Sequence, residues 1–183
     1  MHRTLTRLDS IHGKLLSLIS EIDDERFRRR PTDNEWSVAE VVHHLSLVEQ
    51  YVVNSLEHSL AQPPQRLFLL RRLVPTRIVA WRLLRVKAPK SVQPLDPPAK
   101  EQLIENFNGT RARLKALCVE HKRTRLRQVV FKHPFLGPID GTATVSFVGY
   151  HELRHYKQIR EVLKKIERLT SRGITGTAAV PPA

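Results

Sequence analysis

The chain has 183 residues and a formal net charge of +13, with 40% hydrophobic and 27% charged residues, as in ordinary globular proteins. No apolar run approaches the roughly 20 residues that span a bilayer, and the start of the sequence lacks the apolar stretch of a secretory signal. A single cysteine, Cys118, excludes an internal disulfide framework and suits a reducing compartment. We therefore expect one domain in the cytoplasm.

The first segment, from Thr4 to Ile22, carries apolar residues at helical spacing and predicts a helix. Its stripe consists of Leu5, Leu8, Leu15, Ile19 and Ile22. His12 lies on the same stripe, so we interpret it as a core histidine that has hydrogen-bond partners. The polar residues 28–36 follow, and Pro31 among them indicates a loop.

The second segment begins with a capping box, in which the Ser37 side chain and the Glu40 side chain satisfy each other's backbone amides. The helix that follows has a stripe of Val38, Val41, Leu45, Val48 and Val52. Helical geometry places His44 on the shoulder of this stripe and points His43 toward solvent. One histidine of this helix is therefore expected to face the bundle interior.

The stretch 61–98 is rich in proline and predicts a long connection with two short helices that are broken near Pro75. From 66 to 90 it contains no acidic residue and eight basic ones, namely Arg66, Arg71, Arg72, Arg77, Arg82, Arg85, Lys87 and Lys90. Such a segment attracts nucleic acid, anionic lipid or small anions. A solvated basic face remains the simpler interpretation.

The third helix is expected from Ala99 to Glu120, with Asp96 as an N-cap acid before two prolines. Its buried stripe consists of Leu103, Phe107, Leu114, Leu117 and Cys118. We interpret Cys118 as a small core residue and not as a reactive thiol.

The fourth helix is expected from Thr142 to Arg168, after a turn-rich stretch at 131–142. Its buried line is Val148, Ile159, Val162 and Ile166. Residues 171–183 have no periodicity and predict a flexible tail after a domain of residues 1–170. No strand is expected, since the apolar run at 129–131 is too short for a sheet. The fold class is therefore an all-α four-helix bundle.

His151 and His155 stand four residues apart on the buried line of the fourth helix, close enough for two imidazoles to reach one ion. With 9 histidines in the chain, such a pair can also arise by chance. Two neutral histidines side by side in a core would compete for hydrogen-bond partners, a conflict that a metal ion removes. His44 could supply a third ligand from another helix, which leaves open positions as in catalytic sites.

Three local patterns in this order resemble the DinB-like (DinB/YfiT-like) superfamily of metal-binding four-helix bundles. The first is WSVAEVVHHL at 36–45, the second is HPFLGP at 133–138, and the third is HELRHYKQI at 151–159. The long basic connection is the part of the chain that least resembles the family. We interpret His133 in the second pattern as structural, and Gln158 in the third as a residue that could orient a ligand.

The resemblance implies that His44, His151 and His155 bind a divalent ion, most often nickel or zinc. Relatives of this kind use the metal to activate a thiol cofactor or a water, so the implied activity is that of a metal-dependent S-transferase or hydrolase. Arginines of the connection, represented by Arg71, Arg72 and Arg82, could bind an anionic thiol cofactor or substrate. No separate general base is evident, and Glu40 and Glu49 are only weak candidates.

Two alternatives to an enzyme remain open from the sequence. The basic segment 66–90 could bind an anionic membrane or nucleic acid, although aromatic residues are sparse at 6% and no recognition motif is present. The protein could also be a structural bundle whose histidines serve folding only. The family resemblance further implies a homodimer.

Overall fold

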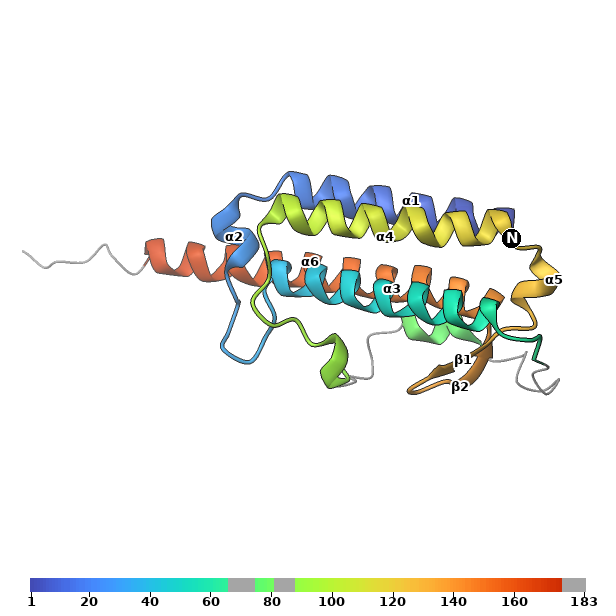
Figure 1. Ribbon diagram of the computed structural model, residues 1–183. Helices are drawn as coiled ribbons and strands as arrows, with labels where there is room; N and C mark the ends of the chain where they lie inside the picture. The colour runs from blue at the N-terminus through green and yellow to red at the C-terminus, as the bar shows by residue number, and fades with distance from the viewer. Residues whose placement is uncertain (66–74, 81–87, 176–183) are drawn as a thin grey trace, which may run out of the picture.

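The protein is described by a computed structural model that covers residues 1–65, 75–80 and 88–175. Its main elements are the four long helices α1 (His2–Ser20), α3 (Val38–Ala61), α4 (Lys100–Glu120) and α6 (Gly141–Thr175). They pack side by side as a bundle, with α1 and α4 over α3 and α6 (Figure 1). The predicted all-α four-helix bundle is therefore confirmed.

The helix α3 begins as its sequence predicts. The Ser37 side chain accepts a hydrogen bond from the Glu40 amide at 3.2 Å, and the Ser37 amide donates to the Glu40 carboxylate at 2.8 Å. Both bonds satisfy amides that have no partner within the helix. The cap thus fixes where α3 starts, and the capping residue Ser37 lies seven residues before His44 along the chain.

Shorter elements connect the long helices. They are α2 (Asp24–Arg28), the 3-10 turns η2 (Thr76–Ala80) and η3 (Lys90–Val92), and α5 (Arg123–Leu126). The expected pair of short helices around Pro75 falls largely on 66–74 and 81–87, outside the described residues. No described helix is long and apolar enough to cross a membrane.

The expectation that the chain has no strand is wrong. The strands β1 (Val130–His133) and β2 (Gly137–Asp140) form an antiparallel hairpin in which Phe131 pairs with Ile139. Both side chains are buried in the core, which stabilises strands that are too short to stand alone. Gly137 has a φ of 69°, a conformation that suits glycine at the start of β2.

Two predicted helix ends also need correction. The helix α4 begins at Lys100, and its N-cap residue Ala99 makes no side-chain cap bond. Asp96 instead has a φ of 43° and lies in a bend before the helix, so its carboxylate does not cap α4. At the other end of the chain, α6 continues past Arg168 to Thr175. The predicted tail therefore begins inside the helix, and residues 176–183 lie outside the description.

The long connection follows from the topology of the bundle. The helices α3 and α4 run in the same direction, so the chain must return along the bundle between them (Figure 1). The ends of both helices meet near Arg125, which donates to the carbonyls of Leu60 at 2.8 Å and Gln62 at 2.6 Å. This guanidinium satisfies carbonyls at the C-terminal end of α3, where a positive charge is favourable.

The bundle interior contains two hydrophobic clusters, one toward each end. One surrounds Phe27, Phe107 and Ile159, and the other surrounds Leu8 and Val148. The long helices contribute residues to both clusters. Buried polar side chains also lie in this interior, and they include His44 and His155 of the candidate site.

Candidate metal centre

The structure brings together the three histidines that the sequence selected. His44 lies on α3, and His151 and His155 lie one turn apart on α6. Their ligand-forming nitrogens all lie within 4.8 Å of one another, and Nε2 of His151 is 3.1 Å from Nε2 of His155. The ring centre of His44 lies 5.3 Å from that of His151 and 4.9 Å from that of His155. We call these residues the histidine cluster.

The outer nitrogen of each of two rings has a defined partner. His44 Nδ1 lies 2.7 Å from the backbone carbonyl of Val92, an acceptor, so this nitrogen carries the proton. His155 Nδ1 lies 2.9 Å from the side-chain oxygen of Gln158 and donates in the same way. Both rings therefore present an unprotonated Nε2, which is the form that binds a metal ion.

The walls of the histidine cluster are aromatic. The ring of Trp36 lies 5.1 Å from that of His44, and the ring of Phe147 lies 5.3 Å from that of His151. Burial lowers the pKa of His44, and it lowers that of His151 well below its ordinary value, with further repulsion from the neighbouring histidines. His44 and His151 therefore stay neutral at pH 7, as metal ligands must.

The donor set fits a divalent ion. Three neutral imidazoles on two rigid helices can hold zinc, nickel or similar ions, and such a set leaves coordination positions for other molecules. The hydrogen bonds to Val92 and Gln158 resemble those that orient histidine ligands in metalloproteins. Gln158 thus occupies the position that the sequence analysis suggested for it.

The other histidines of interest have structural roles. His12 contacts Glu152 and Asn108 within the core, which confirms that it is a core histidine with partners. His133 is buried, and its Nδ1 accepts hydrogen bonds from the amides of Phe135 at 3.1 Å and Leu136 at 3.0 Å. It therefore stabilises the β1–β2 turn.

The prediction for His43 is wrong. This residue is half-buried instead of solvent-exposed, and burial lowers its pKa. Its helix position does point it away from the α3 stripe, but the connection around Asp96 covers this side of α3 closely enough to influence His43 electrostatically. A helical wheel cannot include such a covering segment.

The two carboxylates considered as general bases are committed to other contacts. Glu40 accepts from the Arg30 guanidinium at 2.8 Å and from the Ser37 amide. Burial opposes ionisation of Glu40, but these bonds hold its pKa below the usual value. Glu49 accepts from Arg111 at 2.7 Å and is buried. Neither carboxylate contacts the histidine cluster in these bonds.

The remaining predicted residues divide into two groups. Cys118 is buried, and burial raises the pKa of its thiol to about 11, so its interpretation as a core residue is confirmed. Arg71, Arg72 and Arg82 lie outside the described residues, and their predicted role in anion binding stays a prediction. Of the basic segment, the structure describes Arg77 and Lys90.

Two contributors to the site were not predicted from the sequence. Phe147 precedes His151 by one helical turn, so its position beside that ring could have been found from helical spacing. The Val92 carbonyl had no sequence signal, because any residue offers the same backbone oxygen. Its position depends on how the connection folds against α3.

Together these observations define a four-helix bundle with a candidate three-histidine metal site. The chain belongs to the DinB superfamily, whose family model matches residues 7–159. This finding confirms the predicted resemblance.

One curated relative and two solved structures illustrate the similarity. The uncharacterised protein YuaE of Bacillus subtilis strain 168 is 26% identical over 148 residues, which are 80% of this chain and 89% of YuaE. The four-helix bundle protein TT2238 aligns with a TM-score of 0.59 at 20% identity, over 87% of this chain and 98% of its own. YfiT from Bacillus subtilis, a probable metal-dependent hydrolase with an unusual four-helix bundle topology, aligns with a TM-score of 0.64 at 18% identity. That match covers 91% of this chain and 87% of YfiT, and both structural likenesses show the fold alone.

Proposed function

We propose that His44, His151 and His155 hold a divalent metal ion and that the protein is a metal-dependent hydrolase. The observation that carries this proposal is the convergence of three ring nitrogens within 4.8 Å, two of them in the unprotonated form. The similarity in fold to YfiT, a probable metal-dependent hydrolase, supports the same class of activity. Nickel and zinc are the metals that suit this donor set.

A divalent ion bound by three imidazoles lowers the pKa of a bound water or thiol and so supplies a nucleophile near neutral pH. The protein's own contribution is to position the ligands and to limit access of solvent. His44 and His155 are oriented through Val92 and Gln158, while Trp36 and Phe147 cover the rings with apolar surface. This environment strengthens electrostatic interactions within the site.

Hydrolysis is favoured here over thiol transfer because the fold is similar to that of YfiT, a probable metal-dependent hydrolase. Thiol-dependent transfer by the same histidine cluster is the second form of the proposal, and it shares the metal requirement.

The first test is the metal content of untagged protein, measured by elemental mass spectrometry. We expect one divalent ion per chain in the wild type and its loss in His44→Ala, His151→Ala and His155→Ala. The matched control is His58→Ala, since His58 is an exposed histidine on the same helix as His44. The control variant should retain the ion.

The second test is activity with chromogenic esters, amides and phosphodiesters, followed by thiol-transfer substrates. Activity that disappears with a chelator and returns with nickel or zinc would support the hydrolase proposal. Full metal content and full activity in His155→Ala would contradict it. An absence of bound metal, even after each divalent ion is offered, would leave the histidines as core residues.

The remaining partner predictions are separate from this proposal. Binding of nucleic acid or an anionic membrane by the basic segment 66–90 stays a prediction, which a steep loss of binding with added salt would support. The homodimer also stays a prediction, which the molar mass in solution would check.

A further inference from the structure

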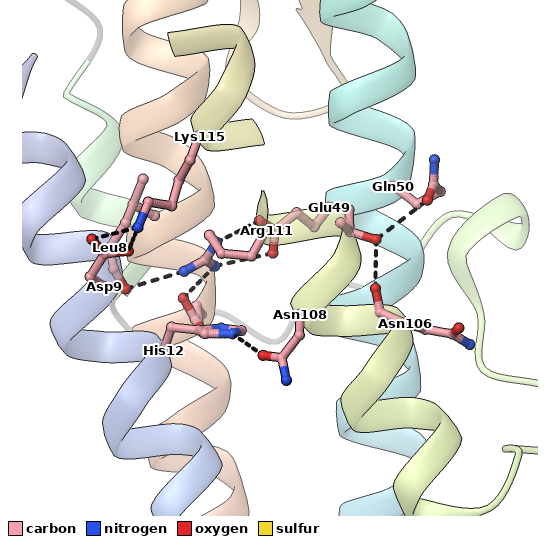
Figure 2. Close-up of polar contacts among 11 residues, drawn as sticks. Leu8, Asp9, His12, Glu49, Gln50, Asn106, Asn108, Arg111 and Lys115 are labelled. Carbon is pink, nitrogen blue, oxygen red and sulfur yellow. Dashed lines mark hydrogen bonds and ion pairs between the residues drawn. The ribbon is translucent and has the colours of Figure 1, made fainter. Parts of the chain in front are cut away.

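A layer of ionisable side chains crosses the core at an intermediate level of the bundle. Each long helix contributes one member, namely His12 from α1, Glu49 from α3, Arg111 from α4 and Glu152 from α6. Their exposed fractions are 8%, 2%, 3% and 1% in this order. Figure 2 shows His12, Glu49 and Arg111 reaching toward one another from three different helices. We call these four residues the charged layer.

Arg111 is the centre of the charged layer. Its Nε donates to Glu49 Oε1 at 2.7 Å, and its Nη2 donates to Glu49 Oε2 at 3.1 Å and to Glu152 Oε2 at 2.8 Å. Its Nη1 donates to the backbone carbonyl of Leu8 at 3.2 Å. One guanidinium therefore bonds to each of the three other long helices.

His12 completes the charged layer. Its Nδ1 lies 3.0 Å from Glu152 Oε1, and its Nε2 lies 2.8 Å from Asn108 Oδ1 (Figure 2). Both ring nitrogens of His12 therefore have a polar partner, one on α6 and one on α4. The second oxygen of Glu152 is thereby satisfied, and α1 is joined to both α4 and α6.

Stability alone gives a poor account of this arrangement. Taking ions out of water is costly, and apolar residues of similar volume often give equal or greater stability. The layer also interrupts the hydrophobic stripes, since Glu49 lies between Leu45 and Val52 on α3. Polar groups at core positions of helical assemblies are best known for fixing the register of neighbouring helices.

The hydrogen bonds of Arg111 depend strongly on register. A slip of one residue moves a helix by about 1.5 Å along its axis, which is more than hydrogen-bond geometry tolerates. Apolar side chains on two helices can repack after such a slip, whereas a forked pair between Arg111 and Glu49 cannot. The charged layer thus penalises every register except the observed one.

The charged layer lies next to the histidine cluster on both helices that carry it. Glu152 directly follows His151 on α6, and Glu49 lies five residues after His44 on α3. We propose that Arg111, through Glu49 and Glu152, sets the register of α3 against α6 that brings His44 to the other two histidines. The metal-binding part of this inference rests on the proposed function, but the register itself does not.

The test compares an apolar version of the layer with a matched control. The apolar variant combines His12→Leu, Glu49→Leu, Arg111→Met and Glu152→Leu. The control combines Arg113→Met with Glu57→Leu, because this pair also joins α4 to α3 at 2.7 Å but is solvent-exposed. Two properties are measured, namely NOEs between the ring protons of His44 and His155 in metal-free protein, and the affinity for Ni²⁺ in competition with a chelator.

We expect the apolar variant to keep its helix content, to lose these NOEs and to bind Ni²⁺ at least about tenfold more weakly, a change typical of misplaced metal ligands. The control should retain both properties. A folded apolar variant that keeps the NOEs and the wild-type affinity would overturn the proposal, because the layer would then be structural only.

If the apolar variant does not fold, Arg111→Lys takes its place, since lysine keeps the charge but cannot form the forked pair. Loss of the NOEs at unchanged helix content would support the register role, and their retention would overturn it. If wild-type protein binds no Ni²⁺ and the NOEs still depend on the layer, the proposed function fails while the register proposal stands.

Discussion

The histidine cluster and the charged layer are both buried and polar, and both use α3 and α6, but their hydrogen bonds are completed differently. In the charged layer, Arg111 and His12 bind the carboxylates of Glu49 and Glu152. In the histidine cluster, the described hydrogen bonds to other groups involve outer nitrogens, and the inner nitrogens face one another. The carboxylates of the charged layer therefore have partners within the layer itself. The inner nitrogens of the histidine cluster instead converge on a position where a cation could bind.

The two groups also differ in how burial changes the protonation of their members. Burial raises the pKa of Glu49, and Arg111 opposes this by supplying a counter-charge within the protein. Burial also lowers the pKa of His44 and His151, which keeps them neutral and able to receive a metal ion. We therefore assign a structural role to the buried network that contains its own counter-ions. The group of neutral imidazoles is the candidate metal-binding site.

Removing Arg111 from the centre of the charged layer should lower the stability of the protein more than any other change considered below. Arg111→Met leaves Glu49 and Glu152 buried without the cation, so we expect the free energy of unfolding to fall by about 3–5 kcal/mol. Urea unfolding of metal-free protein measures this loss. A decrease below about 1 kcal/mol, the range of exposed ion pairs, would mean that the carboxylates are solvated or protonated.

The second prediction concerns His133, a buried histidine that is satisfied without a charged partner. Burial lowers its pKa to about 4 from an ordinary value of 6.5. The folded state therefore resists a proton that the unfolded state accepts. The resulting stability is fully present above pH 6.5, and it is lost as the pH falls toward 4.

The variant His133→Asn isolates this effect. Asparagine can still accept from the turn amides, but it does not titrate. Between neutral pH and pH 4, wild-type protein should lose about 3 kcal/mol more unfolding free energy than the variant does. Urea unfolding at several pH values makes the comparison, in which the other histidines cancel. Parallel losses in the two proteins would show that His133 is not the titrating group.

The sequence predicted the histidine cluster because its signals are local. Helical spacing placed His151 and His155 on one face, and the capping box at Ser37 fixed the phase of the helix that carries His44. The family resemblance selected the same three residues. These signals need no knowledge of how distant segments meet.

The charged layer was missed for an instructive reason. Charged residues are usually exposed, so Arg111 and Glu49 were not counted with the apolar stripes that surround them. Yet Arg111 lies four residues after Phe107 and three before Leu114, both of which are buried. A charged residue at such a stripe position on several helices is a signal that could have revealed the layer.

Other features could not be predicted because they depend on long-range contacts. The β1–β2 hairpin is stabilised by burial against the bundle, and its short strands carry little signal alone. Asp96 matched a cap pattern, but the chain there follows a path that begins α4 at Lys100. The contact of His44 with the Val92 carbonyl likewise depends on the fold of the connection.

A smaller effect is expected from removing the group that orients one ligand. Gln158→Leu deletes the acceptor for His155 Nδ1–H, so the affinity for Ni²⁺ should fall by about tenfold while the helix content stays unchanged. Competition with a chelator measures the affinity. Gln158→Glu is the matched control, since it keeps an acceptor oxygen and should retain binding. Equal affinities of all three proteins would exclude an orienting role for Gln158.

The smallest effect is expected at Arg113, which lies two residues after Arg111 and also pairs with a glutamate of α3. The side chains of Arg113 and Glu57 are 45% and 39% exposed, although their charged atoms are 2.7 Å apart. Water and salt screen this pair, so Arg113→Met should lower the free energy of unfolding by less than about 1 kcal/mol, and less again at high salt. Urea unfolding at two salt concentrations measures the change. If Arg113→Met lowered the free energy of unfolding as much as Arg111→Met does, the link between α4 and α3 would matter more for stability than the burial of the ion pair. The distinction between the buried charged layer and an exposed ion pair would then have no physical basis.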